Sequence, residues 1–515
     1  MNRIKARVVG VAALSAVCAL AVPRVDENSV TMEQAENPSR TVTISYVLTG
    51  EPGIVTFDIE TNVTGTAEWV SIGGKNIQTV AGSVNKLIGT LNQRLSFTWQ
   101  PYMDWPGRTI PAANIRAVVT AWATNAPPNY MAVDLDSTTN VSFYTSADFL
   151  PGSITSKVWR TRKLLMRKIP AANVVWRMGQ PAEERAGLSG TLTNTVQVML
   201  SEDYYAGVFK LTAWQYWKLR GAVEPYGRAI GSTNSWGEPN DESPACGVSW
   251  SIMRSSVRNF VVVAWPRDGH AVGAESLLRI LRDKTGIEFD LPTEAQWEYA
   301  MRAGEGDACY LGGFCTSANA NLIAWHSGDI TKQINGENVT CTTHPCGLKL
   351  PNNWGLYDMV GNGREWCLDY DYPYITGGNV VSGVLVDPKG PSIEEEGAYN
   401  SRYQRTLRTM GTDKPWAEGT GHARSRKRSE FHRRDVLLPP VQPSRDFVPS
   451  GRITRKRLSH EECVFRIACR ILCGGHGWVV CVGGGSRLSD CLSRAFAKGG
   501  GEWNALRARF PPDEL

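Results

Sequence analysis

The stretch Pro351–Cys367, PNNWGLYDMVGNGREWC, decides which kind of domain occupies the middle of this chain. It mixes proline and glycine breakers with two tryptophans and two spaced carboxylates, Asp358 and Glu365. This mixture shows neither the period of an amphipathic helix nor the alternation of a half-buried strand. We therefore expect a loop that something other than a sheet holds in place.

Calcium is one candidate for holding this loop, because it takes several oxygen ligands at about 2.3–2.6 Å from carboxylates and backbone carbonyls. Asp358 and Glu365 offer carboxylates. Gly361 and Gly363 let carbonyls turn inward at little steric cost. The alternative is that these residues only form turns, which is the commoner role of acidic residues in a glycine-containing loop. The residues alone leave both interpretations open.

The start of the chain predicts export. Residues 1–21 carry three basic residues, then an uncharged run, and end on the A-x-A cleavage pattern Ala19-Leu20-Ala21. This signal peptide predicts a periplasmic or extracellular protein. The apolar run is too short for a comfortable membrane span, and no other segment approaches that length. With 515 residues and 18 tryptophans, the chain can build about three globular domains.

The cysteines fit an oxidising compartment. Of the twelve, Cys18 lies in the signal peptide and the rest form an odd set, so they cannot all pair internally. Cys309 with Cys315, or Cys341 with Cys346, would close small disulfide loops. Zinc is the less favoured alternative, because none of these spacings is the tight CxxC of a zinc ribbon.

Residues 23–150 predict an all-β sandwich of the immunoglobulin or fibronectin type, acting as a spacer or adhesion module. The strand-like runs, punctuated by Gly, Pro and Asn, are residues 41–47, 54–59, 95–99 and 115–122. Residues 151–169 are expected to form a linker. Its basic patch, Lys157 to Lys168, is interpreted as a solvated surface rather than a nucleic-acid site.

Helices are expected to be few and short in the middle of the chain. Thr212 can cap a helix over Ala213–Arg220, and a second helix is expected over Ala274–Lys284 with its end at Gly286. The third is marked best. Thr293 and Gln296 form a capping box, and Gly304 supplies a C-terminal stop.

The motifs in this part of the chain resemble those of the sulfatase-modifying-factor family, whose founding activity is the formylglycine-generating enzyme. The blocks that carry the resemblance, in the family's order, are Trp176–Gly179, Val208–Tyr216, Asp290–Gly304, Ala320–Leu322, Trp354–Asn362 and Glu365-Trp366. The resemblance covers about residues 170–390. It implies a domain over 170–400 with an irregular α+β fold related to C-type lectins.

The resemblance also implies calcium as a cofactor of the opening stretch. Asp358 and Glu365 match the family's side-chain ligands, and Gly361 and Gly363 match its carbonyl donors. One departure is Arg364, which stands where the family usually has an aromatic residue. A second calcium site begins at residues that match Asn321 and Leu322, and its other ligands cannot be placed.

The catalytic part of the family pattern is missing. The enzyme oxidises a substrate cysteine with a cysteine pair suited to Cu(I), located after an Arg-Gly-Gly-Ser-Trp block. This chain has Arg408–Asp413, RTMGTD, near that place and no cysteine between Cys367 and Cys463. We therefore expect no copper site and assign no catalytic residue. Cys469 and Cys473 are suitably spaced, but nothing else around them resembles the catalytic block.

The segment after residue 400 changes character, since residues 401–460 hold 15 Lys and Arg against 5 Asp and Glu. We expect residues 401–515 to form a poorly folded basic tail containing Gly and Cys. One hypothesis is a shifted reading frame that begins within residues 392–415. The others are disorder, or a genuine basic tail that binds an anionic surface.

Together these observations predict an exported, calcium-stabilised, non-catalytic binding scaffold for a protein or carbohydrate ligand. The alternative is a formylglycine-generating oxidase, and a sulfatase is expected as partner only in that case. An iron oxygenase would need a histidine set, and His270, His326 and His344 lack helical HxxxH spacing. No nucleic-acid partner is expected.

Overall fold

The computed structural model describes most of the chain from residue 22 to residue 390 and three short strands beyond it. The described ranges are 22–62, 68–136, 141–179, 195–220, 242–245, 248, 250–255, 265–307, 310–312, 321–325, 331–334, 337–340, 344–370, 379–390, 405–408, 463–464 and 468–470. All of them belong to the first of two units, residues 1–471; the second, residues 472–515, lies outside the described residues.

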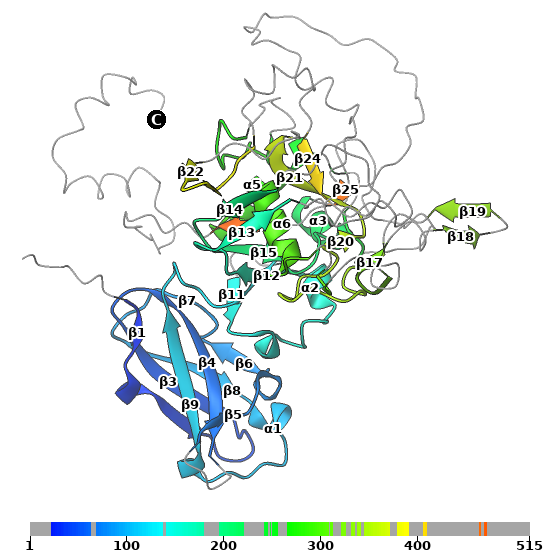
Figure 1. Cartoon of the computed structure of the whole chain (residues 1–515). Coiled ribbons are helices and arrows are strands. Elements are labelled where there is room, and N and C mark those ends of the chain that lie inside the picture. Colours follow the sequence, from blue (N-terminus) through cyan, green and yellow to red (C-terminus); the bar gives the residue numbers. More distant parts are fainter. Residues whose placement is uncertain are drawn as a thin grey trace, which may run out of the picture. The chain divides into compact units, whose positions relative to one another are not determined.

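The N-terminal part consists of two antiparallel sheets (Figure 1). Its strands are β1 (Arg24–Val25), β2 (Thr31–Gln34), β3 (Val42–Thr49), β4 (Gly53–Thr61), β5 (Val70–Ser71), β6 (Val80–Gly82), β7 (Lys86–Ile88), β8 (Arg94–Trp99) and β9 (Ile115–Trp122). One sheet has the order β1-β3-β8-β6 with β2 also on β3, and the other has β5-β4-β7 with β9 also on β4. The four expected strand runs are therefore present as β3, β4, β8 and β9.

The core of these sheets follows from alternation along the strands. In β3 every second side chain is buried, from Val42 to Leu48, and the residues between them are partly exposed. These side chains pack against Phe57 of β4 and against Phe97 and Trp99 of β8 in one hydrophobic cluster. Burial of whole aliphatic and aromatic side chains at about 1.5–3 kcal/mol each stabilises this pair of sheets.

Asp104 closes one edge of this core. It ends helix α1 (Pro101–Asp104), and its Oδ2 accepts hydrogen bonds from the backbone N–H groups of Gln78 and Thr79 at 2.8 and 2.7 Å. The Thr79 hydroxyl and the indole Nε1 of Trp99 donate to the same oxygen, at 2.7 and 3.1 Å. One carboxylate thus fixes a loop against a buried tryptophan.

A third sheet has six strands in the order β11-β10-β12-β15-β26-β16. Its strands are β10 (Tyr130–Asp134), β11 (Val141–Tyr144), β12 (Lys163–Ile169), β15 (Tyr204–Gly207), β16 (Glu288–Asp290) and β26 (Ala468–Arg470). The expected boundary at residue 150 differs from this arrangement, because β10 and β11 belong to the N-terminal range but pair with β12.

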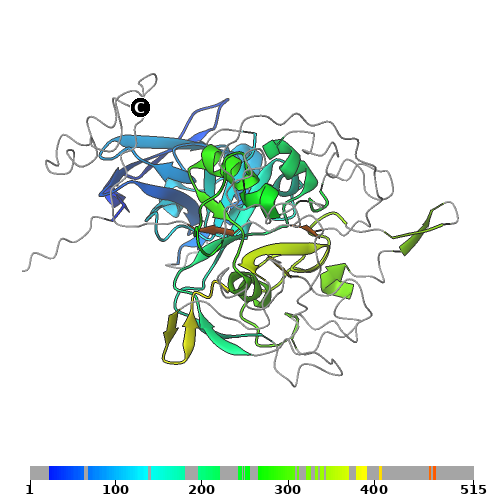
Figure 2. The ribbon, with the colours of Figure 1, turned by 90° about the horizontal axis from the view of Figure 1, so that it is seen from above.

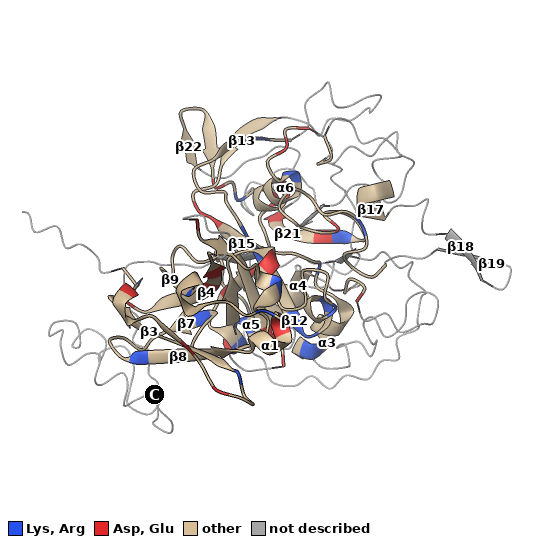
Figure 3. Ribbon diagram, turned by 90° about the horizontal axis from the view of Figure 1, so that it is seen from below, with Lys and Arg blue, Asp and Glu red and all other residues tan. Residues whose placement is uncertain are grey.

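The expected linker over residues 151–169 also contains regular structure. Helix α2 (Val158–Thr161) buries Trp159, and β12 buries Leu164, Leu165, Met166 and Ile169 between its basic residues. Counting Lys and Arg hid this apolar pattern, because long basic side chains can lie along a sheet while their charged ends reach water. Basic and acidic residues are interspersed over the described elements (Figure 3).

The remaining elements are short and joined by loops. The strands are β13 (Val175–Met178), β14 (Val196–Met199), β17 (Ala324–Trp325), β18 (Thr331–Ile334), β19 (Glu337–Thr340), β20 (Val360–Gly361), β21 (Arg364–Tyr370), β22 (Asn379–Val381), β23 (Val384–Val386), β24 (Arg405–Arg408) and β25 (Cys463–Val464). The helices are α3 (Ala213–Arg220), α4 (Trp250–Arg254), α5 (Leu277–Thr285) and α6 (Glu294–Arg302), with 3₁₀ turns at Glu27–Ser29, Gly74–Asn76, Ala112–Asn114 and Ala147–Phe149.

The capping signals placed the helices well. Helix α3 has the predicted bounds, and α5 starts three residues later than expected because Ser276 caps it, with Gly286 left-handed at its end. In α6 both hydrogen bonds of the Thr293–Gln296 capping box are present. The left-handed residue that ends α6 is Ala303, followed by Gly304 at φ 89°.

The chain returns to the domain after residue 400. Strand β26 lies between β15 and β16, and β24 and β25 flank β21. In Figure 2 the orange strands from this end of the chain lie among green and yellow ones. The domain therefore extends beyond the expected limit at residue 400, while the rest of the expected tail lies outside the described residues. No helix among the described residues has the length and apolar character needed to cross a membrane.

Replacing Asp104 by alanine should destabilise the full chain by about 3 kcal/mol, because it leaves two backbone N–H groups and the Trp99 indole without their acceptor. Asp26→Ala is the control, since Asp26 accepts one exposed hydrogen bond from Asn28 N and should cost less than about 1 kcal/mol. Guanidinium unfolding measures both. Equal losses would show that the Asp104 contacts add nothing specific.

Candidate functional site

The centre of the loop-rich domain is a buried ion pair between Lys210 and Glu365, whose side chains are both 0% exposed. Lys210 follows β15, and Glu365 is the second residue of β21. The Lys210 ammonium donates to Glu365 Oε1 and also to the carbonyl of Gly363, at 3.1 Å. A full charge is stable at this depth only when it is paired and hydrogen-bonded, and here both conditions hold.

Trp297 is a second hydrogen-bond partner of the Glu365 carboxylate. Its indole Nε1 donates to Glu365 Oε2 at 3.1 Å, so both carboxylate oxygens accept a hydrogen bond. Trp297 is 2% exposed and lies on α6, whose capping box fixes the start of the helix. The pair thus joins three separate parts of the chain: the end of β15, helix α6 and the start of β21.

The four residues expected to bind calcium fall into two groups. Gly363 and Glu365 both contact Lys210. Asp358 instead accepts from Gly347 N at 2.7 Å through Oδ2 and from Asn362 Nδ2 at 3.3 Å through Oδ1. Asp358 thus connects its own loop to the segment that carries Gly347.

Gly361 lies close against the backbone of Trp325. It pairs with Trp325 in the parallel β17–β20 bridge and has φ 75°. A Cβ atom at this position would lie 2.3 Å from the Trp325 carbonyl oxygen, so only glycine fits. Close backbone approach therefore explains this glycine without a metal.

The donor set does not fit a calcium ion beside Glu365. Calcium takes about six to eight oxygens, whereas the oxygens of Glu365 and Gly363 already face an ammonium that is itself a cation. Among the described residues, no group of three or more His, Cys, Asp and Glu side chains converges on one point. Calcium binding by this protein stays a prediction from the sequence.

The second expected calcium position has a similar neighbour. The carbonyl of Asn321 accepts a hydrogen bond from Lys349 Nζ at 2.6 Å. The same ammonium lies 4.0 Å from the centre of the Trp325 ring, and His344 stacks against that ring at 3.8 Å. Leu322 is 52% exposed. A lysine thus contacts the expected ligand residue here as well.

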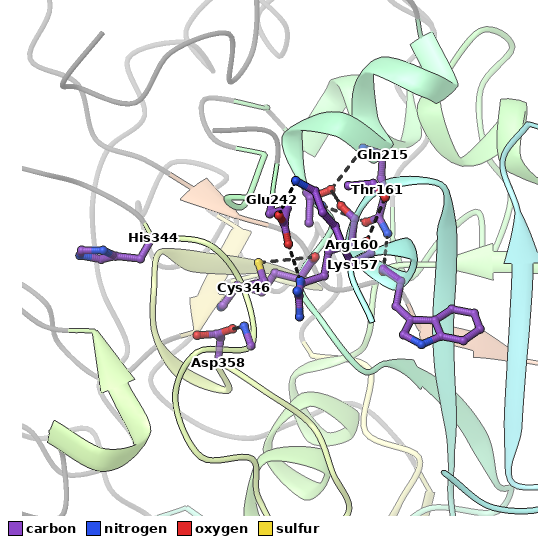
Figure 4. A network of polar contacts seen from close by, with 12 residues as sticks. Lys157, Arg160, Thr161, Gln215, Glu242, His344, Cys346 and Asp358 are labelled. Atoms are coloured by element: carbon purple, nitrogen blue, oxygen red, sulfur yellow. Dashed lines mark hydrogen bonds and ion pairs between the residues drawn. The ribbon is translucent and has the colours of Figure 1, made fainter. Parts of the chain in front are cut away.

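Glu242 organises a second polar network (Figure 4). Lys157 and Arg160 pair with its carboxylate at 3.0 and 2.8 Å, and its carbonyl accepts from Cys346 N at 2.9 Å. Burial by itself raises the pKa of Glu242, but the hydrogen bonds and charges of the two basic residues outweigh it, so the pKa lies below its ordinary value. Glu242 is therefore an anion that links α2 to the segment before Asp358.

Two cysteines with described side chains are core residues. Cys346 and Cys367 are thiols with 0% exposure. Cys341, the expected disulfide partner of Cys346, lies outside the described residues, as do Cys309, Cys315 and Cys473. The backbone of Cys469 is part of β26.

The histidines considered for iron have separate surroundings. His270 Nδ1 lies 2.8 Å from Asp290 Oδ2, and Asp290 also pairs with the buried Arg254 at 2.7 Å. His344 stacks on Trp325, and His326 lies outside the described residues. The sequence reasoning missed the main residue of the site, Lys210. Its signal was a single charge in the apolar run Val208–Leu211.

The part of the chain that contains Lys210 and Glu365 is similar to a known protein family. Residues 196–427 match the model described as "Sulfatase-modifying factor enzyme 1-like domain". The formylglycine-generating enzyme of Thermomonospora curvata is 31% identical over 143 residues, which is 25% of this chain and 47% of that enzyme. The Bos taurus enzyme of the same name is 28% identical over 144 residues, covering 25% and 37%.

Other similarities are shorter or structural. The chaperone protein LppX of Paenibacillus barcinonensis is 35% identical over 92 residues, covering 16% of this chain and 31% of LppX. The chain thus spans less than half the length of these three relatives. Treponema denticola variable protein 1 matches with TM-score 0.33 and 22% identity, covering 60% of this chain and 95% of its own. PvdO from Pseudomonas aeruginosa matches with TM-score 0.36 and 17% identity, covering 59% and 94%.

Lys210→Met and Glu365→Gln should each destabilise the full chain by about 3–5 kcal/mol, because each leaves one buried charge without its partner. The double variant should cost clearly less than the two losses added together. Arg279→Ala is the control, since it breaks the exposed Arg279–Asp283 pair and should cost below about 0.5 kcal/mol. Chemical denaturation of the wild type, the two single variants and the double variant measures the coupling, and additive losses would contradict the buried pair.

Proposed function

Residues 196–427 of this chain form a domain of the sulfatase-modifying factor family, as the motif resemblance predicted, and we propose that this domain is a non-catalytic binding scaffold in an exported protein. The signal-like residues 1–21 support export to the periplasm or the extracellular space. The two N-terminal sheets act as a spacer for the domain.

The observation that carries the proposal is the cysteine chemistry. An oxidase of this kind needs a pair of accessible thiolates that a metal and a substrate can reach. Cys346 and Cys367 are fully buried in the core, out of reach of a substrate. The sequence has no cysteine from residue 368 to residue 462, the range in which the resemblance expects the catalytic pair.

A formylglycine-generating oxidase is the second candidate, and one structural observation favours it. Cys469 belongs to β26, which lies in the six-stranded sheet between β15 and β16. The backbone that carries this cysteine is thus part of the domain. Cys469 and Cys473 are the pair that this alternative requires, and a sulfatase would then be the partner.

An aromatic patch on α3 supports a binding role. We define the α3 patch as Trp214, Trp217, Lys218 and Asp136. The two indole rings lie 5.1 Å apart, Lys218 Nζ is 5.8 Å from each ring centre, and Trp217 is 39% exposed. Asp136 pairs with both Lys218 and Arg162.

This composition suits a protein or carbohydrate ligand. An exposed tryptophan face packs against a sugar ring or an apolar side chain, while the charged rim orients polar groups of the ligand. The hydrogen bonds from Lys218 and Arg162 hold the pKa of Asp136 below its ordinary value, so the patch carries both charge signs at neutral pH. Neither property requires a redox centre.

Full-length protein incubated with Cu(I), oxygen and a peptide with a sulfatase-type cysteine motif should leave the peptide mass unchanged, because the described thiols are buried. Mass spectrometry of the peptide measures conversion to formylglycine. Conversion that disappears in Cys469→Ser and Cys473→Ser variants would overturn the scaffold proposal and establish the oxidase.

Trp217→Ala should weaken binding of ligands captured on glycan and peptide arrays by about 30-fold, which corresponds to roughly 2 kcal/mol for an interface tryptophan. Tyr102→Ala is the matched control, because Tyr102 is a 47% exposed aromatic on α1, far from α3 in the sequence. Surface plasmon resonance measures both affinities. Equal binding by the two variants would exclude the α3 patch as the contact surface.

A further inference from the structure

We propose that the Lys210 ammonium replaces calcium in the Asp358–Glu365 loop, so that this loop is held by an internal cation and folds without metal. The proposal concerns the same oxygens that the family resemblance assigns to calcium. Lys210 Nζ donates to Glu365 Oε1 and to the Gly363 carbonyl. It is independent of whether the domain is a scaffold or an oxidase.

Electrostatics decides between the two cations. Lys210 and Glu365 are both fully buried, where charges interact far more strongly than in water. The single positive charge of Lys210 balances the single negative charge of Glu365. A divalent ion at the same oxygens would lie next to the ammonium and would be repelled by it, and no cluster of three or more His, Cys, Asp and Glu side chains among the described residues is there to hold it.

The backbone on each side of Lys210 is held by hydrogen bonds of its own. Val208 N donates to Leu165 O at 2.8 Å, and Val208 O accepts from Tyr357 N at 2.9 Å. On the other side, the Thr212 hydroxyl donates to Arg160 O at 2.7 Å. The backbone around Lys210 is therefore anchored on both sides, and its ammonium is preorganised for the loop oxygens.

At the second expected calcium position, a lysine also contacts the residue expected to bind the ion. There Lys349 Nζ donates to Asn321 O at 2.6 Å. Lys349 also contacts the ring of Trp325, which is paired with Gly361 of the first loop. Two lysines from different parts of the chain thus contact residues that the resemblance assigns to two separate calcium ions.

Calcium titration of the full-length protein after chelation tests the proposal. The proteins are the wild type, Lys210→Gln, and the doubly neutral Lys210→Gln/Glu365→Gln, which leaves no unpaired buried charge. The matched control is Lys168→Gln, since Lys168 Nζ also donates to a carbonyl, that of Pro127, at 2.9 Å. Two readouts are used: the Tm, and terbium emission sensitised by tryptophan, because an ion at Glu365 would lie close to the Trp297 indole.

The wild type, the Lys168 variant and the double variant should respond to calcium and terbium alike. Lys210→Gln should gain a response of its own, with calcium raising its Tm by about 3 °C or more, because Glu365 and Gly363 are then open to an ion. If Lys210→Gln does not fold, comparison of the wild type with the double variant still tests whether calcium binds at Glu365.

Two results would overturn the proposal. The first is calcium stabilisation or terbium emission in the wild type that the double variant lacks, since the metal would then bind at Glu365 despite the lysine. The second is a folded Lys210→Gln protein whose calcium and terbium responses match those of the double variant, since Lys210 would then not occupy a cation position.

Discussion

The buried pair of Lys210 and Glu365 is the interaction on which the loop-rich domain depends. It connects the end of β15, the loop before β21 and, through the Trp297 indole, helix α6. A domain with so few long strands has few repeated hydrogen-bond ladders to fix its loops. A single charged contact in the interior can supply that constraint, because moving either partner would leave an unpaired charge in an apolar environment.

The same principle recurs on a smaller scale elsewhere in the described chain. Asp104 gathers three groups around a buried tryptophan in the N-terminal sheets, and Glu242 joins α2 to the segment before Asp358. Asp104 does this with one carboxylate oxygen, whereas Glu242 uses its carboxylate toward α2 and its backbone carbonyl toward Cys346. Polar contacts of single acidic residues thus supply a constraint that regular secondary structure does not.

Local signals in the sequence predicted local structure well. The alternation in Thr41–Val47 and the capping box at Thr293 and Gln296 depend only on neighbouring residues, and both appear in the structure. The family was also recognisable from its motifs, which the match over residues 196–427 confirms. Export and calcium are not tested by the structure and stay predictions.

Long-range pairings could not be predicted in this way. Lys210 and Glu365 are 155 residues apart, and no local rule tells a buried lysine in an apolar run from one at a surface. The placement of β26 between β15 and β16, and of β12 in what was expected to be a linker, likewise depends on partners far away in sequence. At β12 the count of basic residues misled because it ignored the apolar residues between them.

A crystal of the full-length protein soaked in a lanthanide salt would test the central claim most directly, through the anomalous signal around Glu365. The account predicts continuous density from Lys210 to the Glu365 carboxylate and the Gly363 carbonyl, with no anomalous peak between them. An anomalous peak bound by Glu365 and Gly363, with the Lys210 side chain displaced, would contradict it.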